Sequence, residues 1–68
     1  MYVIAYPETG RRFENTRFFT VGAAVERIEK IRPGKWERLE PKGAGEMAAR
    51  INQKTGVILV VKDESWTL

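Results

Sequence analysis

The chain contains no cysteine and no histidine among its 68 residues. It therefore cannot form disulfides, thiolate nucleophiles, imidazole acid–base pairs or Cys/His zinc sites. Its only serine, Ser65, has no histidine to activate it, which excludes a Ser–His hydrolytic triad. The composition does not exclude catalysis by a pair of carboxylates. A glycosidase-type pair, however, needs a cleft that buries the substrate, and so short a chain is not expected to build one. We therefore expect a protein that is not an enzyme and that holds no cofactor and no metal.

Long hydrophobic runs are also lacking. The longest unbroken apolar run covers residues 57–61, whereas a membrane-spanning helix needs about 20 such residues. No charged leader precedes an apolar stretch at Met1, so the sequence has no recognisable secretion signal. The absence of cysteine fits a reducing compartment. These features predict a cytoplasmic protein.

The length allows one small domain, residues 1–68, of which residues 63–68 read as a short C-terminal tail. With 43% hydrophobic and 31% charged residues, the composition is that of a folded globular chain. Domains of this size often gain stability from a disulfide, a metal or a partner subunit. Because the first two are excluded here, a homo-oligomer stays open beside a self-sufficient monomer.

The first half of the chain predicts a hairpin followed by a helix. Residues 2–6 are β-branched and aromatic, residues 7–10 have the Pro and Gly of a tight turn, and a returning strand would run through residues 12–19. Within that strand, Asn15 and Thr16 mark either a bulge or a second turn. Thr20 can then cap a helix whose apolar residues recur at spacings of three and four until Pro33 and Gly34 stop it; these are Val21, Ala24, Val25, Ile28 and Ile31.

The second half predicts a strand, a helix and a strand. Residues 35–40 have mixed polarity and suit an edge strand. Residues 44–54 fit a helix with Met47, Ala48 and Ile51 on one face, and the apolar residues 57–61 suit a strand buried on both faces. The sequence thus predicts an α+β domain of order ββαβαβ, with a four-stranded, mostly antiparallel sheet and two helices packed on one face.

Positive charge is spread along the chain. The net charge is +3, yet the basic residues form no block. The least compensated group is Arg11, Arg12 and Arg17 on the predicted hairpin, which we expect to face an acidic partner or nucleic acid.

Aromatic residues lie among these charges, and Trp36 stands near Arg38 on the predicted edge strand. Trp and Arg are enriched at binding hot spots, so Trp36 reads as an exposed anchor whose replacement weakens binding and spares the fold; the alternative is a core position. The predicted partner-binding residues are Arg11, Arg12, Arg17, Trp36 and Arg38.

The opening of the chain carries a pattern of Tyr2-x-Ile4, then Glu8-Thr9-Gly10-Arg11, then Phe19-Thr20 before a helix and Trp36-Glu37. Over its first 40 residues the chain resembles small phage and prophage accessory proteins. The resemblance implies a protein that binds and blocks a host protein, as anti-CRISPR inhibitors do, and it transfers no functional residue. We therefore expect a stoichiometric binding protein with a protein partner. The alternative is a nucleic-acid-binding module that uses the basic, aromatic hairpin and sheet surface.

Overall fold

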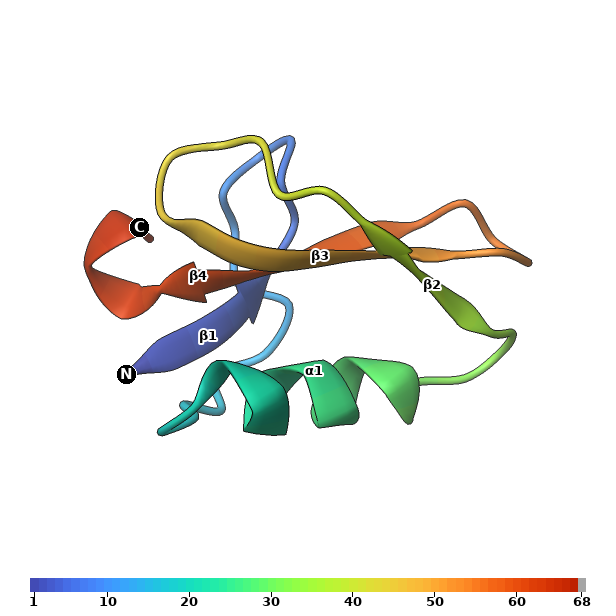
Figure 1. The fold of residues 1–68 in the computed structure, drawn as a ribbon, viewed down its shortest axis with the longest axis horizontal. Coiled ribbons are helices and arrows are strands. Elements are labelled where there is room, and N and C mark those ends of the chain that lie inside the picture. The colour runs from blue at the N-terminus through green and yellow to red at the C-terminus, as the bar shows by residue number, and fades with distance from the viewer. Residues whose placement is uncertain (68) are drawn as a thin grey trace.

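The computed structural model describes residues 1–67 and folds them as a two-layer α+β domain. The four strands pair antiparallel in the order β1-β4-β3-β2. Helix α1 covers one face of the sheet. The loop that follows β1, around residue 8, and the loop between β2 and β3, around residue 43, lie over the other face (Figure 1). The elements are β1 Tyr2–Ala5, α1 Val21–Glu29, β2 Trp36–Leu39, β3 Glu46–Asn52, β4 Ile58–Asp63 and the 3-10 turn η1 Glu64–Trp66.

Helix α1 confirms the predicted capping. The Thr20 side chain accepts a hydrogen bond from the backbone N–H of Ala23 at 3.0 Å, which satisfies one of the free donors of the first turn. Ala24 and Ile28 are fully buried against the sheet. Within residues 1–67, no helix combines the length and the apolar character needed to cross a bilayer.

Strand β4 confirms the predicted buried strand and lies between β1 and β3. Leu59 and Val61 face α1, where they join the core that contains Ile4. Val60 faces the opposite way and packs with Ala5 and Ala49 on the helix-free face of the sheet. The sheet is therefore apolar on both faces although only one carries a helix.

The predicted helix over residues 44–54 is wrong, and with it the prediction of two helices. These residues form β3, which pairs with β2 on one side and β4 on the other. Their Ala, Met, Glu and Arg residues favour helices, but two flanking strands satisfy the backbone of β3 and override that weak preference. Gly56 lies in the β3–β4 turn with φ +78°, a backbone conformation that favours glycine.

The predicted order ββαβαβ is also wrong, because residues 12–19 form no regular strand. They touch β1 through two isolated bridges, Tyr2 with Phe18 and Ala5 with Arg12. Between these bridges the segment is irregular and is held to α1 by Glu14, whose carboxylate accepts two hydrogen bonds from Arg27 at 2.9 and 3.0 Å. The described part of the predicted tail continues β4 to residue 63 and then forms η1, while Leu68 lies outside the described residues.

Asn52 joins the two loops at the far end of the sheet. Its side chain is only 2% exposed, donates to the carbonyl of Pro33 at 2.6 Å and accepts from the N–H groups of Lys54 and Thr55 at 2.9 and 3.0 Å. A β-carbon at Gly34 would clash with Asn52 and Lys54, so the two loops lie in close contact. The buried amide thus fixes where the chain leaves α1 and enters β2.

We predict that Asn52→Ala lowers the free energy of unfolding by about 3 kcal/mol, because it leaves buried backbone groups without partners. Asn52→Asp keeps an acceptor for the two N–H groups but sets a second acceptor oxygen against the Pro33 carbonyl in a buried site, so we expect it to destabilise at least as strongly. Urea unfolding measures both, with the exposed neighbour Gln53→Ala as control, expected within about 0.5 kcal/mol of wild type. Equal stabilities for Asn52→Ala and Gln53→Ala would contradict this role.

Candidate functional site

Arg12 and Arg17, both predicted to bind a partner, converge on one carboxylate. Arg17 Nη2 lies 2.8 Å from Glu64 Oε1, and Arg12 Nη2 lies 3.6 Å from Glu64 Oε2. Arg12 also donates to Thr67 Oγ1 at 3.1 Å. Glu64 therefore offsets one of the two positive charges of these predicted arginines, and Arg12 in particular ties the irregular segment to the C-terminal turn.

The turn η1 that carries Glu64 is held on both sides. The Glu64 N–H donates to the carbonyl of Met1 at 2.9 Å, which joins the two ends of the described chain. Asp63 caps η1 by accepting from the Ser65 N–H at 3.0 Å and from Ser65 Oγ at 2.9 Å. These two hydrogen bonds, chiefly the one from the backbone N–H, hold the pKa of the Asp63 carboxyl below its ordinary value.

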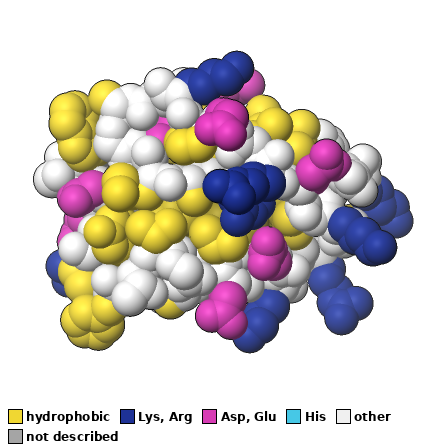
Figure 2. Space-filling view, in the orientation of Figure 1, with side chains coloured by type: hydrophobic (Ala, Val, Ile, Leu, Met, Phe, Trp, Pro, Cys, Tyr) yellow, Lys and Arg dark blue, Asp and Glu magenta, His cyan; other side chains and the backbone are white. Residues whose placement is uncertain are grey.

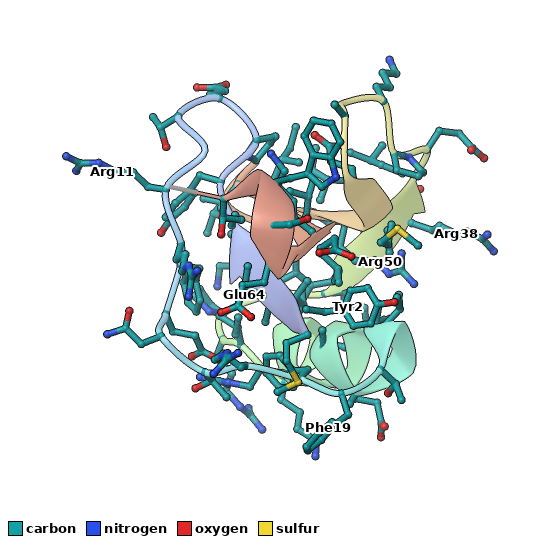
Figure 3. The ribbon with its side chains drawn as sticks, turned by 90° about the vertical axis from the view of Figure 1, so that its left-hand side faces the viewer. Tyr2, Arg11, Phe19, Arg38, Arg50 and Glu64 are labelled. Carbon is teal, nitrogen blue, oxygen red and sulfur yellow. The ribbon has the colours of Figure 1, made fainter. Side chains whose placement is uncertain are left out.

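Two exposed apolar side chains lie at the same end of the molecule as this ion pair. Phe19 is 86% exposed and Trp66 is 58% exposed, and Figure 3 shows Phe19 projecting away from the ribbon on the side of the molecule that carries Glu64. Hydrophobic side chains also protrude at the left-hand end of Figure 2, where Figure 1 places both termini. We call this surface the terminal face and define it as Met1, Arg17, Phe19, Glu64 and Trp66.

Trp66 is positioned by Gly45, one of the glycines with positive φ. A β-carbon at Gly45 would clash with the indole, so the ring lies directly over this residue. The N–H of Asp63 donates to the Gly45 carbonyl at 3.1 Å, which holds the loop before β3 against the start of η1. The exposed indole is thus seated on a fixed piece of backbone.

The other predicted arginines lie elsewhere. Arg11 and Arg38 project at opposite margins of the view in Figure 3. Arg11 lies on the loop after β1, whereas Arg38 lies on β2, opposite Arg50 of β3. The five predicted residues therefore do not form one surface, and only Arg12 and Arg17 are brought together.

Trp36 is half-buried and packs against the helix-side core. Its Nε1–H donates to the carbonyl of Ile31 at 2.9 Å, just after α1. The Trp36 ring therefore connects β2 to the end of α1 and has a structural role.

The helix-free face carries two apolar hollows that share Pro7 and Ile58. One, of about 380 Å³, extends toward Arg11 and Val57. The other, of about 220 Å³, extends toward Leu39 at the edge of the sheet. Among residues 1–67, no three acidic side chains gather in a way that could hold a metal ion.

Sequence reasoning did not select Phe19, Glu64 or Trp66. Phe19 directly precedes the helix cap Thr20, a position where an apolar side chain usually packs on the helix, so its exposure had no local signal. Glu64 and Arg17 are 47 residues apart, and only the pairing of the chain ends brings them together.

We predict that Trp36→Ala lowers the free energy of unfolding by about 2–3 kcal/mol, because it removes a packed ring and its hydrogen bond. Trp36→Phe keeps most of the packing and should cost about 1 kcal/mol. Denaturant unfolding measures both, with the exposed Arg38→Ala as control. An unchanged stability for Trp36→Ala would support the exposed-anchor interpretation instead.

We predict that the Asp63 carboxyl titrates with a midpoint below 3.8, measured by NMR of its carboxyl carbon. Because the pKa is lowered in the folded state, the stabilisation of η1 is present above the ordinary pKa and is lost as the pH falls through the folded pKa. Ser65→Ala removes the hydroxyl donor but keeps the backbone donor, so the midpoint should rise and stay below 3.8. A midpoint that does not move would contradict the capping role of the hydroxyl.

Comparison of the chain with family models, with curated proteins and with solved structures gives no match.

Proposed function

We propose that this chain is a non-catalytic protein that binds a protein partner stoichiometrically through the terminal face. The observation that carries the proposal is the exposure of Phe19 and Trp66 at the end of the molecule that carries the Arg17–Glu64 ion pair. Phe, Trp, Met and Arg are enriched at protein interfaces, and a few desolvated aromatic anchors supply most of the binding energy. A domain this small has few large side chains to leave in water, so 86% exposure of Phe19 favours a role outside the fold.

The charge of the terminal face favours a protein over a nucleic acid. Arg17 is 53% exposed at its side chain but already pairs with Glu64. The Glu64 carboxylate offsets one of the two positive charges of Arg12 and Arg17, so fewer phosphates would be neutralised and fewer counterions released on binding. A protein surface can accommodate both signs of charge, because its own polar rim offers donors and acceptors.

The terminal face is also largely preorganised. Met1, Arg17 and Glu64 are joined by hydrogen bonds of 2.8–2.9 Å, and Trp66 rests on Gly45. Side chains that are fixed before binding lose less conformational entropy when the partner arrives. The same contacts would support a regulator or inhibitor that blocks a host protein in the cytoplasm, which is the role that the resemblance to phage accessory proteins implies.

The experiment compares capture of partner proteins from lysate of the source organism by wild type, Phe19→Ser, Trp66→Ser and Val57→Ser. Val57 is an exposed apolar residue of the larger hollow and serves as the matched control. We predict that the partner retained by wild type and Val57→Ser binds each terminal-face variant at least about 30-fold more weakly, as measured by calorimetry with the purified partner.

Two outcomes would contradict the proposal. Full retention of the partner by the Phe19→Ser/Trp66→Ser double variant would place the interface elsewhere. Binding of labelled DNA or RNA that weakens steeply with salt, without any captured protein, would support the nucleic-acid alternative. Circular dichroism of each variant checks that the fold is intact.

A further inference from the structure

The two edges of the sheet differ in whether another segment of the chain covers them. The outer side of β1 is covered by the irregular segment, since Tyr2 and Phe18 exchange two backbone hydrogen bonds of 2.8 Å and Phe13 donates to Ile4 at 2.8 Å. Strand β2 ends the sheet on the other side and pairs only with β3 among residues 1–67. An uncovered edge strand is a template for a further strand.

The register of β2 shows which of its backbone groups are free. Gln53 donates to the carbonyl of Lys35 at 2.8 Å, so Lys35 belongs to a hydrogen-bonded pair with β3. In an antiparallel ladder such pairs recur at every second residue, which directs Glu37 and Leu39 inward as well. The N–H and C=O groups of Trp36 and Arg38 therefore point outward, and Glu40 continues this alternation.

We propose that β2 pairs antiparallel with β2 of a second copy, in a register centred on Leu39. A two-fold axis perpendicular to the joined sheet keeps both helices on the same face. Leu39 then lies opposite Leu39 of the second copy, and Arg38 of each copy lies opposite Glu40 of the other. This inference concerns an edge outside the terminal face and does not depend on the proposed function.

Charge compensation favours this register. Arg38 lies directly opposite Arg50, and like charges at opposed positions destabilise a sheet. Arg50 has a partner in Glu29 at 3.5 Å, whereas neither Arg38 nor Glu40 forms an ion pair within the described chain. The Glu40 side chain of a second copy would supply the missing anion beside Arg38.

Other symmetric registers are less favourable. Centring on Arg38 or on Glu37 places each of these charges opposite its own copy. Centring on Trp36 pairs Lys35 with Glu37 of the other copy, but it also brings together the α1–β2 loops, and with them the cations Arg32 and Lys54 of both copies. Lys54 lies against Gly34 in this region, and dark blue side chains gather at the corresponding right-hand end of Figure 2.

The dimer would also extend the apolar surface. Leu39 packs against Ala5, Ala49 and Val60 and lines the hollow of about 220 Å³. Because the two-fold axis leaves both helix-free faces on one side, the hollows of the two copies would adjoin across the Leu39 pair. Burial of this seam gives a small domain without disulfide or metal an additional source of stability.

The test measures association of the purified full chain by sedimentation equilibrium up to about 1 mM. We predict that wild type dimerises and that Arg38→Glu or Glu40→Arg alone raises the dimer dissociation constant about tenfold or more, because each creates two like-charged pairs per dimer. An equimolar mixture of the two variants restores opposite charges and should form a heterodimer with near wild-type affinity. The double variant Arg38→Glu/Glu40→Arg should likewise regain dimerisation, and the exposed control Arg11→Glu should not change it.

A wild-type chain that stays monomeric throughout this range would overturn the inference, as would a mixture that associates no better than either variant alone. The Phe19→Ser/Trp66→Ser variant should dimerise as wild type does. Loss of its dimer would show that the copies meet through the terminal face and would also overturn the β2 pairing. Partner capture is measured separately on the terminal-face variants, so failure of either proposal is distinguishable from failure of the other.

Discussion

The arrangement of the sheet depends on the buried amide of Asn52. Strand β2 reaches its partner β3 only after the chain has left α1 through an exposed loop that packs few apolar side chains. Asn52 substitutes for such packing by bonding the Pro33 carbonyl and two N–H groups of the β3–β4 turn. A buried polar group is tolerated when all its hydrogen bonds are made, and its geometry then selects one arrangement of the loops. The positions of the edge strand and of Trp36 follow from this selection.

The sequence predicts the parts of the fold that are specified locally. The Thr20 cap and the spacing from Val21 to Ile28 suffice for α1, and the run at residues 57–61 suffices for a buried strand. The prediction for residues 44–54 is wrong because their helix propensity and their apolar spacing both fit a helix. The decisive constraint is the pairing of β3 with two other strands. Pairing of that kind carries no signal within a short window of sequence.

The candidate site is less accessible to sequence analysis than the fold. Arg12 and Arg17 have no acidic partner nearby in the sequence, but Glu64 at the other end of the chain lies against both. Charge counting along the sequence finds partners at helical spacing and misses partners joined by tertiary structure. The exposure of Phe19 and Trp66 has the same origin, since it depends on which apolar side chains the single helix and the loops leave uncovered.

The terminal face and the β2 edge are separate surfaces, yet their positions link them. The antiparallel order places the Leu39 end of β2 toward the terminal face. Leu39 is aligned across the sheet with Ala49, Val60 and Ala5. The pair of Tyr2 and Asp63, next to Met1 and Glu64, lies three residues further along the strands, roughly 10 Å away. In a dimer centred on Leu39 the two terminal faces point in opposite directions, each beside the other copy. A partner that extends past one terminal face would therefore meet the second copy. Contact there would make partner binding and dimerisation thermodynamically coupled, so that each changes the equilibrium constant of the other by the same factor.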